Sequence, residues 1–190
     1  LGAVLASDEC YAELGWEEPW DAVRVPSVLD PAVIGDDLTS VLSVYSLSKQ
    51  SNLAGYRAAF VAGDENLISR LLTGRKHLGL MPPAPVQRAM TVALEDDAHV
   101  AEQRARYARR RATLKPAVEA AGFTIDHSEA GLYLWATEGR DAWASMDRLA
   151  DLGILAGPGH FYGSHFPQHV RFSLTATDER VAAAADRLTP

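Results

Sequence analysis

The sequence of 190 residues has one cysteine, no excess of positive charge and no long apolar run. The single cysteine, Cys10, excludes a disulfide within the chain and is compatible with a reducing compartment. The net charge of -7 and the pI near 5.3 argue against general binding to nucleic acid or to an anionic membrane, because both need a positive surface. No stretch approaches the length of a transmembrane helix. These absences favour an acidic cytoplasmic protein with no nucleic-acid or membrane partner.

The first residues of the chain also lack features. Residues 1–7 contain no initiating Met and no basic leader, so we do not expect a signal peptide there. We expect instead that the chain enters in the middle of a fold, as a fragment or a truncated product. With 47% hydrophobic residues it can still bury a substantial core.

The most informative segment is SLSKQSNLAGYR, residues 46–57, which contains Lys49. The apolar run Val41–Tyr45 precedes it and has the β-branched and aromatic residues typical of a buried strand. Lys49 is therefore expected just past a strand end. Partial burial at such a place disfavours the ammonium form and makes the amine a usable nucleophile toward a carbonyl.

The neighbours of Lys49 suit a phosphate group. Arg57 offers a planar fork, and the hydroxyls of Ser46 and Ser48, with backbone N–H groups at a helix start, complete a cradle. A lysine beside a phosphate cradle suggests pyridoxal phosphate. The alternative is that Lys49 and Arg57 are ordinary surface charges, which requires the whole hydroxyl–lysine–glycine–arginine spacing to arise by accident.

The segment SLSKxxxLAGYR resembles the Schiff-base segment of the class I and II (fold type I) pyridoxal phosphate aminotransferases. The chain from residue 1 to 190 is similar to the second half of such an enzyme. The resemblance implies that Lys49 is the catalytic residue and carries the cofactor, and that Ser46, Ser48 and Arg57 hold its phosphate. It also implies amino acid and 2-oxo acid substrates and a homodimeric full-length form. The family's first half supplies the rest of the cofactor site.

A D-x-x-Y pattern, Asp8 to Tyr11, follows the short apolar run Val4–Ala6, which predicts a parallel strand buried on both faces. Ligands of open α/β sheets bind beyond the carboxyl ends of the strands, so both residues could meet a cofactor. By resemblance, Asp8 pairs with the protonated pyridine nitrogen and Tyr11 hydrogen-bonds the phenolic oxygen. A carboxylate at that nitrogen keeps the ring a good electron sink. The alternative is an aspartate in a turn.

Near the carboxyl terminus, Val170–Thr175 alternates like a strand and puts Arg171 on the face opposite its two apolar neighbours. An arginine in mid-strand needs an anion. By resemblance, an arginine in a V-R-h-S segment binds the α-carboxylate of the substrate, where a bidentate fork fixes orientation as well as charge. A cross-strand ion pair is the alternative.

Three further patterns predict no additional site. His160, His165 and His169 invite a zinc interpretation, but no flanking cysteine or acidic ligand completes a motif, so no metal is expected. The glycines of residues 157–163 miss the dinucleotide fingerprint, and by resemblance this is a loop at the active-site mouth. The basic run over 104–111 predicts a solvated helix face.

The expected fold class is α/β: the C-terminal part of a large cofactor-binding domain, a mostly parallel sheet with helices, followed by a small α+β domain. We place the large-domain part at residues 1–85, a long linking helix at 86–120 and the small domain at 121–190. The remaining elements expected are a long loop over 12–40, a buried strand at 58–62, a helix from the cap Asp64 to His77, strands at 123–126, 131–136 and 154–156, a helix at 141–152 and a final helix capped by Thr177.

The resemblance implies transamination in two half-reactions, with glutamate as the expected donor and Lys49 as the base that shuttles the proton. The segments SLSKxSxLAGYRAAFVAGD, RKHxGxMxPAPVQxAM and VRFSLTATDERVAAA are most similar to the actinobacterial-type N-succinyl-diaminopimelate aminotransferases of lysine biosynthesis. Two alternatives stay open. One is a C–S β-lyase of the same fold, which makes ammonia and pyruvate, and the other is an aminotransferase-like effector domain of a transcription regulator. A third possibility is that this chain by itself is inactive, because half of the site is absent.

Overall fold

The structure, a computed structural model, describes residues 2–21 and 25–189 and divides the chain into two compact units. The first unit comprises residues 1–15 and 22–103, and the second comprises 16–21 and 104–190. Residues 22–24 fall within the loop expected over 12–40 and lie outside the described ranges.

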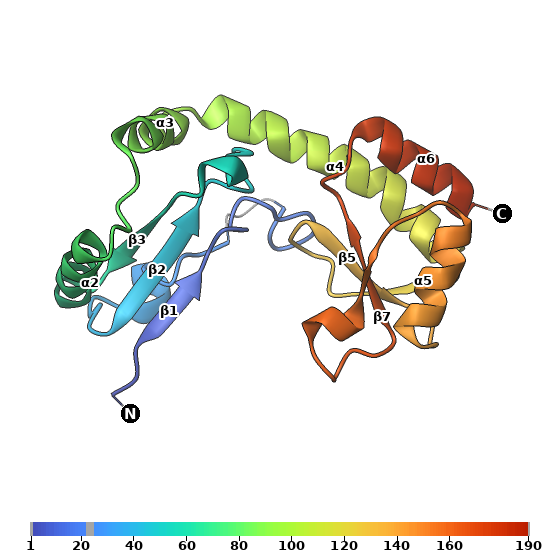
Figure 1. Cartoon of the computed structure of the whole chain (residues 1–190), viewed down its shortest axis with the longest axis horizontal. Helices are drawn as coiled ribbons and strands as arrows, with labels where there is room; N and C mark the ends of the chain where they lie inside the picture. The colour runs from blue at the N-terminus through green and yellow to red at the C-terminus, as the bar shows by residue number, and fades with distance from the viewer. Residues whose placement is uncertain (1, 22–24, 190) are drawn as a thin grey trace. The chain divides into compact units, whose positions relative to one another are not determined.

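A three-stranded sheet forms the centre of the first unit, in the order β1 (Leu5–Asp8), β2 (Val41–Ser46), β3 (Ala59–Gly63) (Figure 1). The strands β1 and β2 are parallel, as expected, whereas β2 and β3 are antiparallel. The expectation of a mostly parallel sheet therefore does not hold for these three strands. The connection over 47–58 contains only a 3₁₀ turn, η1 (Ala54–Tyr56), and not the crossover helix that a parallel pairing needs.

Burial in this sheet is concentrated on β2. Val41, Leu42 and Tyr45 are buried, and Tyr45 joins Leu47 and Met90 in a small core. The expectation that β1 and β3 are buried strands is wrong for this structure, since most of their residues are exposed. Both strands lie at the edges of the described sheet, where each has a single neighbour.

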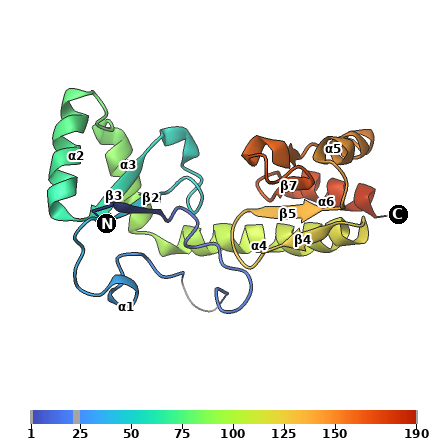
Figure 2. The same ribbon diagram turned by 90° about the horizontal axis from the view of Figure 1, so that it is seen from below.

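One helix of the first unit begins at its predicted cap. The helix α2 (Glu65–His77) lies beside β3, and the carboxylate of Asp64 accepts from the N–H groups of Asn66 and Leu67, which confirms it as the N-cap (Figure 1). The loop between β1 and β2 contains a short helix, α1 (Pro31–Ile34), which is best seen in Figure 2. The helix α3 (Ala84–Leu94) contributes Met90 to the core.

The helical stretch expected over 86–120 is two helices, α3 and α4 (Asp97–Ala120). The carboxylate of Asp96 accepts from the N–H of Ala98 at 2.9 Å, as an N-cap side chain does. Because that side chain satisfies an N–H at the start of α4, a new helix begins there instead of continuing α3. The division between the two units falls within α4, between residues 103 and 104.

The second unit contains an antiparallel sheet in the order β4 (Thr124–Asp126), β5 (Tyr133–Thr137), β7 (His169–Ser173), β6 (Gly157–Pro158). The helices α4, α5 (Ala142–Asp151) and α6 (Asp178–Leu188) lie beside it (Figure 1). Burial alternates along β5 and β7, so one face of the sheet carries the core. The side chain of Thr177 accepts from the N–H of Arg180 and caps α6, as the sequence predicts.

The predicted position of one strand of this unit differs from the observed one. The strand expected at 154–156 is wrong: the paired residues are Gly157 and Pro158, opposite Arg171 and Val170. The apolar residues of the expected strand have other roles. The N–H of Ile154 donates to the carbonyl of Leu149 and closes the end of α5, and the side chain of Leu155 is 93% exposed.

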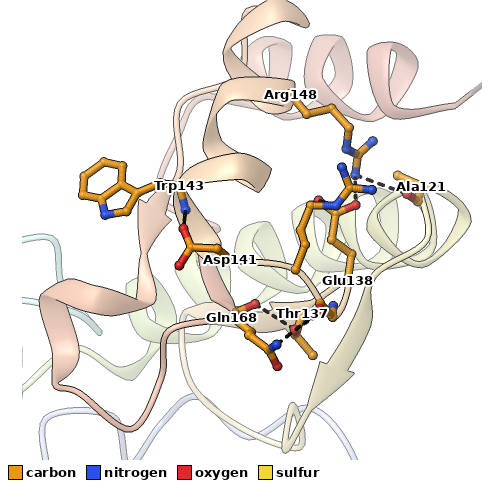
Figure 3. Close-up of polar contacts among 9 residues, drawn as sticks. Ala121, Thr137, Glu138, Asp141, Trp143, Arg148 and Gln168 are labelled. Atoms are coloured by element: carbon orange, nitrogen blue, oxygen red, sulfur yellow. Dashed lines mark hydrogen bonds and ion pairs between the residues drawn. The ribbon is translucent and has the colours of Figure 1, made fainter.

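A buried carboxylate ties α5 to the sheet (Figure 3). Glu138, directly after β5, forms an ion pair of 2.8 Å with Arg148 of α5. Arg148 also donates to the carbonyl of Ala121, at the end of α4. At the other end of α5 the carboxylate of Asp141 caps the helix by accepting from the N–H of Trp143. These contacts hold the sheet and the helix ends of the second unit together.

Candidate active site

The carboxyl ends of β1 and β2 bring three of the candidate residues to one edge. Asp8 ends β1, Tyr11 follows in the next turn, and Lys49 lies in the turn directly after β2. The Nζ atom of Lys49 is 5.8 Å from the centroid of the Tyr11 ring. Because β1 and β2 are parallel neighbours, their carboxyl ends lie at the same edge of the sheet.

Cys10 responds to the charges at this edge. Burial, together with the hydrogen bond and the negative charge of Asp8, raises the pKa of the thiol to about 11, although the positive charge of Lys49 acts in the opposite direction. The N–H of Cys10 also donates to Asp8 Oδ1 at 3.2 Å. One thiol therefore lies within electrostatic reach of both Asp8 and Lys49.

A pair of hydroxyls lies beside Lys49. Ser46 Oγ and Ser48 Oγ are 2.7 Å apart, and the N–H of Ser48 donates to Ser46 Oγ at 3.2 Å. Ser46 Oγ also approaches the carbonyl of Ala58, the residue that follows Arg57. The structure thus brings both serines and the backbone next to Arg57 together. The guanidinium of Arg57 itself is exposed and donates to the carbonyl of Ala54 at 2.8 Å.

The side chains at this edge fit pyridoxal phosphate in their chemistry. Two adjacent hydroxyls and a guanidinium suit a phosphate group, a carboxylate suits a protonated ring nitrogen, and a half-buried amine suits an aldehyde carbon. The two serine hydroxyls are 2.7 Å apart and hydrogen-bond each other, so one hydroxyl proton is not engaged in this bond and can donate to an anion, and the other can follow if the ligand replaces this bond.

Arg171, in the second unit, has aromatic neighbours. Its guanidinium carbon is 4.2 Å from the centroid of the Tyr133 ring and 5.0 Å from that of Tyr162. Val170 and Phe172 are buried on the other face of β7, as the alternation predicts. The residues opposite Arg171 on the neighbouring strands are Trp135 and Gly157, so the alternative of a cross-strand ion pair is wrong. Its Nε atom is buried without a hydrogen-bond partner in the described part of the chain.

Sequence reasoning missed Glu9, which fastens the loop before α1 to the sheet edge. Its carboxylate accepts from the N–H of Val28 at 2.7 Å. Although burial raises the pKa of Glu9, hydrogen bonds from Val28 and from the hydroxyls of Ser27, Ser43 and Ser7 hold it below its ordinary value. A signal was available in the sequence, since Glu9 lies inside the D-x-x-Y pattern.

The histidines considered for zinc have other partners. His169 pairs with Asp126 at 2.9 Å and stacks on the ring of Trp135, and His160 pairs with Asp141 at 3.3 Å. Among residues 2–21 and 25–189, no three His, Cys, Asp or Glu side chains gather in a way that could hold a metal ion. No helix within these ranges is long and apolar enough to cross a membrane.

The family model described as aminotransferase class I and II matches residues 1–188. The chain therefore belongs to the class I and II aminotransferases, which are enzymes that depend on pyridoxal phosphate. This confirms the family resemblance and the expected cofactor.

Two curated relatives are each 58% identical to the chain over 188 residues, 99% of its length. One is the 4-dedimethylamino-4-oxo-anhydrotetracycline transaminase OxyQ of Streptomyces rimosus, and the other is named "Probable aminotransferase Rv1178", from Mycobacterium tuberculosis. The match covers 51% of the first and 44% of the second. The chain thus spans about half the length of the curated relatives it matches.

Solved aminotransferase structures share the fold. An aminotransferase from Neisseria meningitidis is 30% identical with a TM-score of 0.85, over 97% of this chain and 48% of that one. A probable N-succinyldiaminopimelate aminotransferase from Thermus thermophilus is 27% identical with a TM-score of 0.81, over 98% and 49%. The α/β fold of an aminotransferase is confirmed. The names of the Thermus protein and of OxyQ point to different substrates.

Proposed function

We propose that the protein in its full-length form is a pyridoxal phosphate-dependent transaminase that moves an amino group between an amino acid and a 2-oxo acid. The observation that carries the proposal is the amine of Lys49 at the ring of Tyr11, on the strand edge that also holds Asp8. Membership of the aminotransferase family supports the same reaction.

Lys49 is the proposed catalytic residue. Its amine would hold the cofactor, and as a free amine it would take the proton from the α-carbon of the substrate and pass it on. When bound, pyridoxal phosphate supplies the electron sink for the carbanion left at that carbon. Asp8 would pair with the protonated ring nitrogen, and the hydroxyl of Tyr11 would donate to the phenolic oxygen.

Two sets of side chains hold charged groups in this proposal. The hydroxyls of Ser46 and Ser48, with the positive charge of Arg57, bind the phosphate of the cofactor. Arg171 binds the α-carboxylate of the substrate. Two observations support this role of Arg171. Its guanidinium lies beside the rings of Tyr133 and Tyr162, and the residues opposite it on the neighbouring strands are not acidic.

For the substrate we propose glutamate as amino donor and the N-succinyl-diaminopimelate pair of lysine biosynthesis as the other partner. The three sequence segments and the likeness to the Thermus protein support this assignment. The 58% identity to OxyQ favours a second candidate, an anhydrotetracycline ketone as amino acceptor. We also propose that the full-length protein is a cytoplasmic homodimer, as the family resemblance implies.

The test uses the full-length protein mixed with pyridoxal phosphate. We expect an absorption band from the lysine-linked cofactor, its loss in Lys49→Ala, and glutamate-dependent conversion to pyridoxamine phosphate with formation of 2-oxoglutarate. A band that persists in Lys49→Ala contradicts the assignment of Lys49. Ammonia and pyruvate from a sulfur amino acid, in place of a new amino acid, identify a β-lyase instead.

A second assay decides between the substrates. With glutamate as donor, kcat/KM is compared for the 2-oxo acid related to N-succinyl-diaminopimelate and for 4-dedimethylamino-4-oxo-anhydrotetracycline. A preference of about a hundredfold for the first supports the lysine-pathway assignment, and the reverse preference supports the second candidate.

A further inference from the structure

The turn that carries Lys49 is shaped by its own backbone. The N–H groups of Ser51 and Leu53 both donate to the carbonyl of Leu47, at 3.1 and 3.3 Å. Asn52 has a left-handed backbone with φ of 54°, which asparagine tolerates better than most residues. Side-chain contacts of the residues after Lys49 add to these backbone bonds.

Three consecutive residues after Lys49 each have a side-chain partner. Gln50 accepts from the hydroxyl of Tyr45, within the sheet that ends at the site, and both side chains are buried. Ser51 and Asn52 are bound by two residues of the helix α4. The turn is therefore held from the strand on one side and from α4 on the other.

The contacts from α4 are made by His99 and Gln103, which lie four residues apart and so face the same side of the helix. The Nε2 atom of His99 is 2.8 Å from Ser51 Oγ. The Oε1 atom of Gln103 accepts from Asn52 Nδ2 at 2.9 Å. Gln103 is 8% exposed, so removal of its amide oxygen would leave the Asn52 amide without this buried acceptor.

A carboxylate orients His99. The Nδ1 atom of His99 lies 3.2 Å from Asp96 Oδ2, and the carboxylate of Asp96 also accepts from the N–H of Ala98. With Nδ1 directed to a carboxylate, Nε2 is the atom that meets Ser51. The ring of His99 is thus fixed at both nitrogens.

We propose that His99 and Gln103 are positioning residues for Lys49. They act through Ser51 and Asn52, and by fixing the turn they set where the Lys49 amine lies relative to Tyr11. The inference rests on the proposed function, because it takes Lys49 as the reactive amine. Its physical basis is that proton transfer and bond formation depend steeply on geometry: a misplacement of about 1 Å can cost about a hundredfold in rate.

The test uses the full-length protein loaded with pyridoxal phosphate. Gln103→Met keeps the length of the side chain and removes the acceptor, whereas Gln103→Glu keeps an oxygen acceptor. His99→Phe removes the hydrogen bond to Ser51. The matched control is His77→Phe, a change at an exposed histidine on α2.

Two readouts separate positioning from mere loss of stability. One is kcat against KM for the amino acid, and the other is the pH midpoint of the absorption change of the lysine-linked cofactor. We expect Gln103→Met and His99→Phe to lower kcat about tenfold and to shift that midpoint, with KM changed by less than about twofold because Arg171 is untouched. Gln103→Glu and the His77 control keep the parental values.

A double variant tests the path through Ser51. If His99 acts through this one hydrogen bond, Ser51→Ala combined with His99→Phe is no slower than the slower single variant. Ser51→Ala is the smaller change, so it keeps the test decisive if His99→Phe does not fold.

The inference is overturned if Gln103→Met and Ser51→Ala both keep the parental kcat and pH midpoint, or if Gln103→Glu is as slow as Gln103→Met. A different result would contradict the proposed function itself: the parent protein would show no cofactor absorption band, or the band would persist in Lys49→Ala.

Discussion

The guanidinium of Arg171 lies 4.2 Å from the ring centroid of Tyr133, on the neighbouring strand and two residues out of register. Diagonal neighbours in an antiparallel sheet share a face, so the aromatic ring and the cation meet there. A ring stabilises a guanidinium without neutralising its charge. The positive charge of Arg171 therefore stays available to an incoming anion.

From this geometry we expect Arg171→Ala to raise KM for the amino acid about a hundredfold, because a charge-paired hydrogen bond to the substrate is lost. Arg171→Lys restores the charge without the bidentate fork and should give an intermediate KM. Steady-state kinetics of the full-length protein measure both values. Loss of bound cofactor with an unchanged KM would give Arg171 a structural role instead.

Cys10 is expected to resist alkylation in the cofactor-free protein. With a thiol pKa of about 11, roughly one thousandth of the side chain is thiolate at pH 8. The rate with iodoacetamide should rise about tenfold per pH unit, and Asp8→Asn should speed it at pH 8 because the negative charge that raises the thiol pKa is removed. Mass spectrometry of the peptide containing Cys10 follows the reaction. Labelling at the rate of an unhindered cysteine would contradict the assigned environment.

The core of the second unit offers a matched pair of leucines. Leu134 on β5 is fully buried, whereas Leu155 is 93% exposed. We expect Leu134→Ala to cost about 3 kcal/mol and Leu155→Ala less than about 0.5 kcal/mol. Hydrogen exchange of the β7 amides in the full-length protein reports the stability of this unit separately. Equal costs at the two positions would contradict the placement of β5 in the core.

Glu17 gives the second unit a pH-dependent contact. Hydrogen bonds with Lys115 and then Arg111 lower the pKa of its carboxyl from 4.5 to about 2. A lowered pKa stabilises the folded state above the unfolded value, so this contribution is present above about pH 4.5. It is lost as the pH falls from there through 2.

We expect Glu17→Gln to be less stable than the parent by about 1 kcal/mol at pH 7, a modest value because the side chain is partly exposed and screened by solvent. The difference should shrink between pH 4.5 and 2, and Glu18→Gln, at the exposed neighbour, should show none. Unfolding curves at pH 7, 4 and 2.5 provide the measurement. A difference that stays constant over this range would show that the charge of Glu17 is not involved.

Local elements could be predicted because their causes are local. The apolar run at 41–45 made β2, and the Asp64 and Thr177 side chains capped the helices that follow them. The predictions that were wrong concerned how a strand pairs with other strands and how far they cover it. The direction of β3 depended on the connection that precedes it, and the exposure of β1 and β3 depended on their place at the sheet edges.

The candidate chemistry could be predicted from residue types and short spacings: a lysine after a strand, a hydroxyl pair, a D-x-x-Y turn and an arginine in a late strand. Which of these residues meet depends on how the chain folds. The tertiary structure brought Lys49 to the ring of Tyr11, turned the Arg57 guanidinium to the Ala54 carbonyl and set His99 and Gln103 against the turn after Lys49. Contacts across about fifty residues follow from packing, which local pattern does not encode.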